Sequence, residues 1–270
     1  MFVNWLCVRY VVSSYSPSVY GEDIRQATIT STSSNEELHI TEQEVSNNND
    51  LKGTKNNSPS VMYVMSGVSD CGLPQRTVHP YWSWVPCIVC NHSRPPRCHH
   101  CALCRTCVLK RDHHCFFVGS CVGYRNMRHF IVFCFWGSVA CLYAAIHSSL
   151  YYYYIMFEQT TILDMFPVSV HMRWCFGRAS GKTTTLTSVL WSLIFFFPLT
   201  FHFLYINMDM IVKGQTSFER DNNIRMSDGR SVQNKLKSVF GRYWYLNIIV
   251  PLHSLFPALE DPVHWPDVHP

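Results

Sequence analysis

The chain has 270 residues, of which 15% are charged and 14% are aromatic, and its formal net charge is +4 at pH 7. Soluble domains typically carry about 25% charged residues, so aromatic and aliphatic side chains have replaced charge here, and this favours contact with lipid. A net charge this small gives no argument for a nucleic-acid partner. The composition therefore speaks against an ordinary water-soluble domain.

The first segment, residues 1–80, is rich in Ser, Thr and Asn and contains no long apolar run. Its first twelve residues are partly apolar but are interrupted by Asn4 and Arg9, and no convincing cleavage site follows, so we predict no secretory signal. Hydrophobic periodicity is weak throughout the segment. We predict a polar, flexible N-terminal segment over 1–80.

A Cys/His block occupies residues 81–128. Of the thirteen cysteines, eight fall within the 35 residues from Cys87 to Cys121. Cys-x2-Cys pairs mixed with histidine suit zinc thiolates in a reducing compartment better than a disulfide framework. Proline, arginine and short spacings predict loops and tight hairpins. Six cysteines and two histidines supply eight ligands, which is enough for two tetrahedral zinc ions.

Two cysteines of the block, Cys98 and Cys115, are left over by this count. Cys98 lies between Arg97 and His99 and is interpreted as a spare thiol. Cys115 directly follows an Asp-His-His triplet. A thiol, a base that can take its proton and a carboxylate that orients the base are the groups that nucleophilic catalysis needs. Cys115 is therefore the candidate nucleophile.

Two long apolar runs follow, at residues 129–157 and 186–212. Each exceeds the roughly 20 residues that a helix needs to cross a membrane. Tyrosines at 151–154 end the first run, as is typical of the membrane interface. Pro198 lies inside the second run and is expected to kink it. We predict two transmembrane helices; the alternative is two buried helices of a soluble protein.

The distribution of Lys and Arg predicts the orientation of these spans. Basic residues are numerous before the first run and after the second, whereas the connecting segment, 158–185, holds three. The positive-inside rule places the Cys/His block and the C-terminal region, 213–270, in the cytosol. Residues 158–185 are then predicted to form a lumenal loop.

The sequence from Cys87 to Phe130 resembles the cysteine-rich domain of the DHHC palmitoyltransferases. The resemblance is carried by Arg94-Pro-Pro-Arg97, Asp112-His-His-Cys115, Cys121-Val-Gly and Asn126-x3-Phe130. It implies two structural zinc ions, each bound by three cysteines and one histidine. By position, one site takes Cys87, Cys90, His100 and Cys107, and the other takes Cys101, Cys104, His114 and Cys121.

The resemblance also implies the catalytic roles. Cys115 would be the acylated nucleophile, His113 its general base and Asp112 the residue that orients His113. The acyl group would come from palmitoyl-CoA or another acyl-CoA and pass to cysteines of protein substrates. The expected protein is a multi-pass integral membrane protein of the endoplasmic reticulum or Golgi, with its catalytic domain cytosolic and with no nucleic-acid partner.

Three features depart from or extend the family pattern. Phe116, Phe117 and Ser120 stand where most members have Pro, Trp and Asn, which puts efficiency and chain preference in doubt. Gly214–Glu219 resembles the family's Thr-Thr-x-Glu element, with Ser217 for the second Thr. The family normally has two transmembrane helices before the cysteine-rich domain, and we predict none in 1–80.

The expected fold is a mostly α membrane protein, in which two transmembrane helices follow a small cytosolic domain of short β-hairpins that holds two zinc ions. The leading hypothesis is a protein S-acyltransferase. The alternatives are a catalytically weak or inactive membrane zinc adaptor and a zinc module that binds nucleic acid. Retention of the whole Asp112–Cys115 quartet favours the enzyme, because zinc binding alone requires only His114.

Overall fold

A computed structural model describes residues 2–17, 61–68, 74–156, 158, 160–249, 259, 261–265 and 267–269. The chain forms two compact units. The cysteine-rich unit comprises Ser13–Arg111 and Pro262–His264, and the helical unit comprises Met1–Val12, Asp112–Asp261 and Trp265–Pro270. The boundary at Arg111 lies inside the predicted Cys/His segment 81–128.

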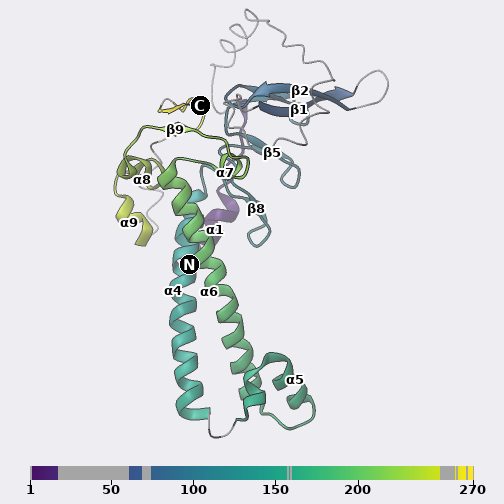
Figure 1. Ribbon diagram of the computed structural model, residues 1–270, viewed down its shortest axis with the longest axis vertical. Coiled ribbons are helices and arrows are strands. Elements are labelled where there is room, and N and C mark those ends of the chain that lie inside the picture. The colour runs from purple at the N-terminus through teal and green to yellow at the C-terminus, as the bar shows by residue number, and fades with distance from the viewer. Residues whose placement is uncertain are drawn as a thin grey trace, which may run out of the picture. The chain divides into compact units, whose positions relative to one another are not determined.

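The cysteine-rich unit is built from antiparallel hairpins, which confirms the prediction of short β-hairpins in this part of the chain (Figure 1). The paired strands are β1 (Val61–Val68) with β2 (Pro74–Pro80), β3 (Val85–Cys87) with β4 (His92–Arg94), and β5 (His99–Cys101) with β6 (Thr106–Val108).

Two of these hairpins turn at a Cys-x2-Cys pair in the same way. The residue after the second cysteine has a left-handed backbone in both, with φ of 52° at Asn91 and 53° at Arg105. This conformation is uncommon for residues with a side chain and marks a tight turn. The two turns therefore present their cysteines from equivalent positions.

The helical unit is dominated by two long helices, α4 (Met127–Tyr151) and α6 (Gly181–Lys213), which pack along each other (Figure 1). A π-helical turn, η2 (Tyr152–Met156), continues α4. Ser180 caps the start of α6, accepting a hydrogen bond from the amide of Thr183 at 3.1 Å. Gly214, with φ of 71°, ends the helix in the left-handed region, as is common at helix C-termini.

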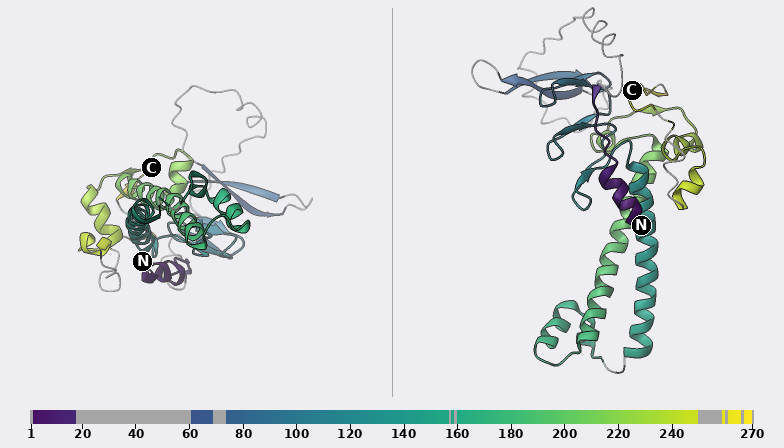
Figure 2. Two further views of the ribbon diagram at one scale, coloured as in Figure 1. Left: turned by 90° about the horizontal axis from the view of Figure 1, so that it is seen from below. Right: turned by 180° about the vertical axis from the view of Figure 1, so that it is seen from behind.

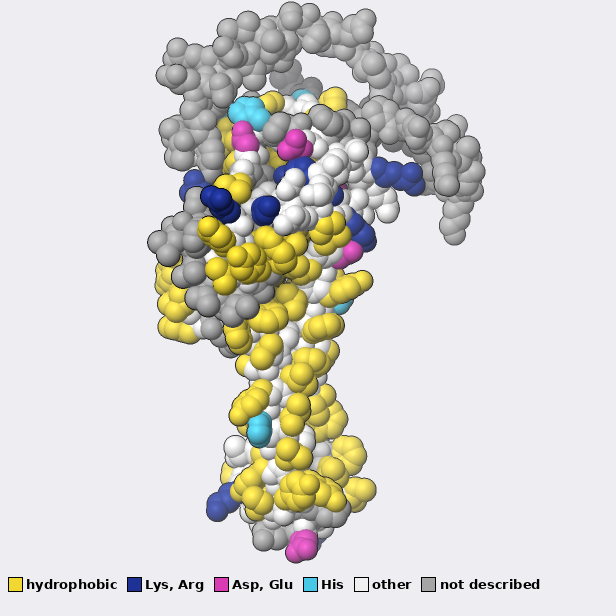
Figure 3. Space-filling model, turned by 90° about the vertical axis from the view of Figure 1, so that its left-hand side faces the viewer, with side chains coloured by type: hydrophobic (Ala, Val, Ile, Leu, Met, Phe, Trp, Pro, Cys, Tyr) yellow, Lys and Arg dark blue, Asp and Glu magenta, His cyan; other side chains and the backbone are white. Residues whose placement is uncertain are grey.

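Both helices are long and apolar enough to cross a membrane, over Met127–Met156 and Gly181–Lys213. The prediction of two such helices at 129–157 and 186–212 is confirmed to within a few residues, and α6 continues through Pro198 as one helix. Apolar side chains of α6 stay uncovered: Phe195 is 64% and Phe201 53% exposed. Hydrophobic side chains cover the surface along α4 and α6 (Figure 3).

The segment between these helices, predicted as a loop over 158–185, contains its own structure. It holds a 3-10 turn, η4 (Ile162–Met165), and helix α5 (Pro167–Cys175), which packs beside the first turns of α6 (Figure 1). Asp164 is buried, closes a capping box with Thr161 and pairs with Arg173 at 2.8 Å. This ion pair, in which the carboxylate is buried, links η4 to α5.

Two short elements of the helical unit lie at the start of α4. Helix α1 (Phe2–Tyr10) packs against α4 (Figure 2), and strands β7 (His114–Cys115) and β8 (Ser120–Cys121) form a two-stranded hairpin. Isolated helices below about 12–15 residues are marginal in water, so α1 depends on this packing. The prediction of a flexible segment over 1–80 missed both α1 and the β1–β2 hairpin.

The remaining elements surround the end of α6. They are α7 (Ser217–Asp221), β9 (Ser227–Asp228), α8 (Val232–Phe240), α9 (Trp244–Ile249) and β10 (Val268–His269), with β9 paired to β10. Phe240 of α8 is fully buried in a cluster with Ile131 and Val132 of α4. The C-terminal region thus contributes to the core of the helical unit.

Candidate active site and metal centre

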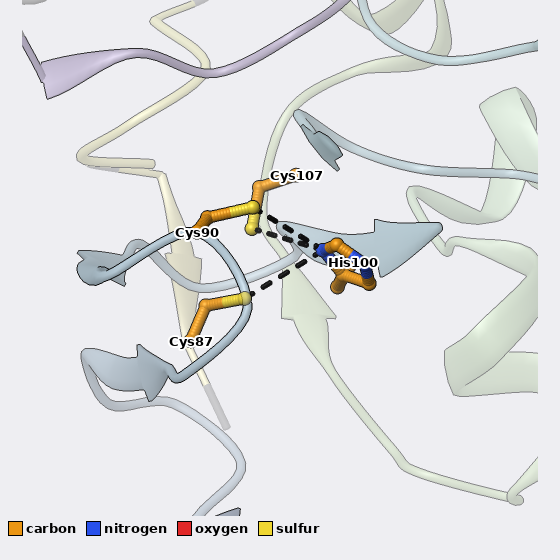
Figure 4. A group of neighbouring side chains, drawn as sticks. All are labelled: Cys87, Cys90, His100 and Cys107. Carbon is orange, nitrogen blue, oxygen red and sulfur yellow. Dashed lines mark hydrogen bonds between the residues drawn. The ribbon is translucent and has the colours of Figure 1, made fainter. Parts of the chain in front are cut away.

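Four predicted zinc ligands come together in the cysteine-rich unit. Nδ1 of His100 lies 3.6 Å from the sulfur of Cys87, 3.3 Å from that of Cys90 and 4.0 Å from that of Cys107 (Figure 4). A tetrahedral zinc ion, with Zn–S bonds of about 2.3 Å and Zn–N bonds of about 2.0 Å, places nitrogen and sulfur about 3.5 Å apart. These residues therefore fit a closed structural zinc site.

The pKa shifts in this cluster reflect burial and the crowding of its thiols. Burial, followed by the neighbouring thiols of Cys107 and Cys87, raises the pKa of Cys90 to about 12. Burial, followed by Arg94 and Arg111, lowers the pKa of His100 and keeps the imidazole neutral, which is its metal-binding form. A divalent cation would convert the crowded thiols to thiolates, because its positive charge would offset the repulsion between neighbouring thiolates.

The structure separates His100 from its neighbour His99. Nδ1 of His99 lies 3.4 Å from the guanidinium of Arg94, away from the three thiols of the cluster. Burial, followed by the charges of Arg94 and Arg111, lowers the pKa of His99 to about 3. The neighbouring Cys98 is buried, and its carbonyl accepts a hydrogen bond from Arg94 at 2.7 Å. Neither residue belongs to the cluster.

The other four predicted ligands are divided between the two units. In the cysteine-rich unit, the amide of Cys104 donates to the sulfur of Cys101 at 3.5 Å. In the helical unit, His114 pairs with Cys121 across β7 and β8, and Nδ1 of His114 lies 3.7 Å from the Cys121 sulfur. Within each pair, the atoms that could bind a metal ion lie within 4.8 Å of each other.

The three predicted catalytic residues lie together in the helical unit. Nδ1 of His113 is 2.8 Å from Oδ2 of Asp112, whose side chain is 5% exposed. Cys115 interacts electrostatically with His113, but Nε2 of His113 has no aligned hydrogen-bond partner among the residues that the structure describes. Catalytic hydrogen bonds are often long before substrate binds and tighten afterwards. Nε2 is thus the nitrogen available to the thiol.

The charges of this group favour a thiolate beside an imidazolium. Burial lowers the pKa of His113, but the interactions with Asp112 and then Cys115 outweigh it and raise the pKa to about 9. Burial raises the pKa of Cys115, but His113 and the backbone amide of Val118 outweigh burial and lower it. A lowered thiol pKa beside a base is what activates a cysteine as a nucleophile.

Aromatic rings from both long helices fix the His113 imidazole. Its ring is stacked on Phe203 of α6, with centroids 5.8 Å apart, and meets Phe130 of α4 edge-on at 5.2 Å. Phe130 is buried in a cluster with Val8, Val118 and other apolar residues, against which Cys115 packs. The His113 imidazole therefore contacts both of the helices that the sequence predicted as membrane spans.

Asn126 was identified in the sequence only as part of the Asn126-x3-Phe130 motif. In the structure its side chain joins three segments. Its fully buried side chain accepts from the amide of Gly123 at 2.8 Å and donates to the carbonyls of Cys121 at 2.8 Å and Val8 at 3.0 Å. It therefore ties the end of the β7–β8 hairpin to α1 and to the start of α4.

The segment that resembles the family's Thr-Thr-x-Glu element, Gly214–Glu219, forms a helix cap. Thr216 accepts from the amide of Glu219 at 3.3 Å, and the carboxylate of the fully buried Glu219 accepts from the amide of Thr216 at 2.8 Å. Such reciprocal caps fix the start of a helix, here α7. Farther along the chain, Asn234 lies exposed in the first turn of α8, whereas the buried Asn247 donates to the carbonyl of Phe240.

Comparison with known proteins identifies this arrangement. The family model described as DHHC palmitoyltransferase matches residues 83–224, which is more than half of the chain. The chain is 30% identical to palmitoyltransferase ZDHHC22 of Rattus norvegicus over 165 residues, covering 60% of this chain and 62% of the relative.

Two further relatives match different lengths. Palmitoyltransferase ZDHHC15 of Xenopus laevis is 30% identical over 187 residues, covering 67% of this chain and 49% of the relative. A probable protein S-acyltransferase 16 of Arabidopsis thaliana is 45% identical over 60 residues, covering 22% of this chain and 21% of the relative. The chain thus spans less than two thirds of the length of these curated relatives.

Proposed function

Because the chain belongs to the DHHC palmitoyltransferase family, we propose that it is a protein S-acyltransferase that works through an S-acyl intermediate on Cys115. The observation that carries this proposal is the Asp112–His113 hydrogen bond of 2.8 Å beside a cysteine with a lowered pKa. A carboxylate that orients an imidazole, which in turn serves a thiol, is the arrangement used in nucleophilic catalysis.

In the first step, the thiolate of Cys115 attacks the carbonyl carbon of the acyl-CoA thioester. A new C–S bond forms to Cys115, the C–S bond to CoA breaks, and the departing CoA sulfur takes a proton from the His113 imidazolium. Asp112 holds Nδ1–H of His113, so that Nε2 serves the thiol. This hydrogen placement is inferred from the Nδ1–Oδ2 contact.

In the second step, a cysteine of the target protein gives its proton to Nε2 of His113. Its thiolate attacks the acyl carbon, the bond to Cys115 breaks, and the Cys115 thiolate is restored. The two steps consume no oxidant or reductant. The net reaction exchanges one thioester for another, so the enzyme supplies positioning and charge stabilisation.

Two zinc ions would hold the frame of this site. Cys87, Cys90, His100 and Cys107 would bind one ion. By the family resemblance, the second would be bound by Cys101, Cys104, His114 and Cys121. Zinc in such closed sites supplies folding energy. His114 adjoins both His113 and Cys115, so the second ion would fix the catalytic segment of the chain.

Residues 129–157 and 186–212 would cross the membrane, with 158–185 lumenal and with 81–128 and 213–270 cytosolic. The exposed apolar surface of α6 supports a membrane location, since large exposed apolar patches are rare on water-soluble proteins. A multi-pass protein of the endoplasmic reticulum or Golgi would give Cys115 access to cytosolic acyl-CoA.

Palmitoyl-CoA is the proposed acyl donor. Phe117, two residues after the nucleophile, is 67% exposed, and its ring lies 6.0 Å from that of Phe133 on α4. An acyl chain attached to Cys115 would extend past these rings and then along the apolar surface of α4 and α6. Burying a lipid chain contributes about 0.8 kcal/mol per CH₂, so this surface would set much of the affinity.

The alternative is a catalytically weak or inactive zinc adaptor with the same fold. The exposure of Phe117 favours it, because an acyl chain that packed on this ring would stay uncovered on one side. Transfer from labelled palmitoyl-CoA to a cysteine-containing peptide, by the full chain in lipid nanodiscs, separates the two. Label on the peptide that requires Cys115 supports the enzyme, and zinc-loaded protein without any acyl label supports the adaptor.

A further inference from the structure

The turn that follows Cys115 is bound by a residue from the opposite end of the sequence. Nη1 of Arg9, on α1, donates hydrogen bonds to the carbonyl of Val118 at 3.3 Å and to the carbonyl of Gly119, 109 and 110 residues away in the chain. Val8 is buried beside Val118 in one apolar cluster. Helix α1 therefore contacts the turn in two ways, through the hydrogen bonds of Arg9 and through the apolar packing of Val8.

The same turn faces Cys115 on its other side. The amides of Val118 and Gly119 donate to the carbonyl of Cys115 at 3.2 and 2.8 Å. In the peptide group between Val118 and Gly119, the carbonyl thus accepts from Arg9 while the N–H donates to Cys115. This peptide group is therefore hydrogen-bonded at its carbonyl and at its N–H. The charged Arg9 donor at the carbonyl polarises the peptide group and strengthens the hydrogen bond that its N–H donates to Cys115.

Gly119 makes this contact possible. Its φ of +68° is a conformation that L side chains rarely adopt, and a Cβ placed there would lie 2.6 Å from Nη1 of Arg9. The guanidinium therefore occupies space that any side chain at position 119 would need. Glycine at 119 serves both the turn and the close approach of Arg9.

We propose that Arg9 is a positioning residue for the reaction at Cys115: by holding the carbonyls of Val118 and Gly119, it fixes the turn that carries the nucleophile. This inference rests on the proposed function. The backbone amides of Phe117 and Val118, which interact with the Cys115 sulfur, belong to the same turn. A loose turn would let the sulfur drift from Nε2 of His113.

Arg9→Met keeps most of the side-chain length and removes every donor. We expect the saturating rate of Cys115 acylation to fall roughly two- to fivefold, the scale of an exposed charged contact. The acyl-CoA concentration at half saturation should stay unchanged, because Arg9 acts on the turn. Arg9→Lys, which restores a charged donor, should recover part of the rate. Zinc content should be equal in all variants.

Arg220→Met is the matched control. Arg220 pairs with Asp221 on the surface of α7, so its loss should leave the rate unchanged. A changed half-saturating concentration in Arg9→Met, with the saturating rate intact, would mean that Arg9 binds the acyl donor and would overturn the positioning role.

A double-mutant cycle with Gly119→Ala tests the contact itself. Both substitutions break the same contact, so Gly119→Ala should cost less in the Arg9→Met background than in the original chain. Additive effects would overturn the inference, since residues that share no contact behave additively.

Amide hydrogen exchange of residues 115–119 supplies a readout that needs no transferase activity. We expect faster exchange in Arg9→Met and unchanged exchange in Arg220→Met. Absence of acylation in the original chain would contradict the proposed function, whereas unchanged exchange in Arg9→Met would contradict the role of Arg9.

Discussion

Nδ1 of His113 and Oδ2 of Asp112 lie 2.8 Å apart, and the carboxylate that makes this contact is almost completely buried. Since Asp112 is shielded from water, its charge acts on the imidazole more strongly than it would at an exposed site. The contact orients the ring so that its other nitrogen is left for Cys115.

Asp112→Asn should therefore slow Cys115 acylation more than it perturbs the fold. An amide has nearly the same shape but no charge, so it neither stabilises the imidazolium nor enforces the tautomer. We expect the single-turnover rate to fall by about 10²–10⁴, the usual contribution of a general base, with zinc content retained. Asp221→Asn, at an exposed aspartate on α7, is the control and should have no effect. Equal rates in both variants would contradict the role of Asp112.

His113 and His114 should give opposite phenotypes although they are adjacent. His113→Ala should keep both zinc ions and slow acylation by about 10²–10⁴, as loss of a base does. His114→Ala should lose one zinc ion and part of the fold, since Nδ1 of His114 faces the Cys121 sulfur at 3.7 Å. Metal analysis beside a single-turnover assay distinguishes them. Exchanged phenotypes would require the base and the ligand to be swapped.

The pH dependence of acylation should be bell-shaped. The thiolate–imidazolium pair exists above the pKa of Cys115, which is lowered from 9.0, and below that of His113, which is raised to about 9. The rate should rise as Cys115 ionises, and it should fall above about pH 9 as His113 loses the proton that the leaving CoA takes.

His113→Gln checks the cause of this profile. The ascending limb should move upward toward the ordinary thiol value, because His113 is the largest influence that lowers the pKa of Cys115. Iodoacetamide labelling of Cys115 across pH measures the same ionisation without acyl-CoA. An ascending limb that stays in place would show that His113 does not set the pKa.

The orientation of the spans can be tested with glycosylation acceptors. An Asn-x-Thr acceptor with Gly/Ser spacers, inserted after the exposed Gly177, should be glycosylated in microsomes because 158–185 is proposed to be lumenal. The same cassette inserted after the exposed Asn223 should stay unmodified. The reverse pattern would place Cys115 away from cytosolic acyl-CoA.

Much of this architecture could be predicted from sequence because its signals are local. Uncharged apolar runs longer than a membrane is thick predicted α4 and α6 to within a few residues. Proline, arginine and short spacings predicted the hairpins. The family resemblance grouped Cys87, Cys90, His100 and Cys107, which the structure brings together. In these cases the chemistry is encoded in a short stretch of chain.

The features that were missed depend on contacts far apart in the chain. Helix α1 has nine residues and too little periodicity to be recognised, and its order comes from packing on α4. The contact between Arg9 and Gly119 joins residues 110 positions apart. Asp164 and Arg173 are only nine positions apart, but they pair within a segment that was predicted only as the connection between two apolar runs. Hydrophobic periodicity and residue spacing do not predict which side chains will form these contacts.

The central claim is that Cys115 carries the acyl group while zinc holds the frame. Its most direct test is intact-protein mass spectrometry of the full chain and of Cys115→Ser, each incubated with palmitoyl-CoA and analysed for zinc. The account predicts one hydroxylamine-sensitive palmitoyl group on the original chain, none on Cys115→Ser, and near two zinc ions in both. An acyl group that persists in Cys115→Ser, or an equal loss of zinc with Cys115, would contradict it.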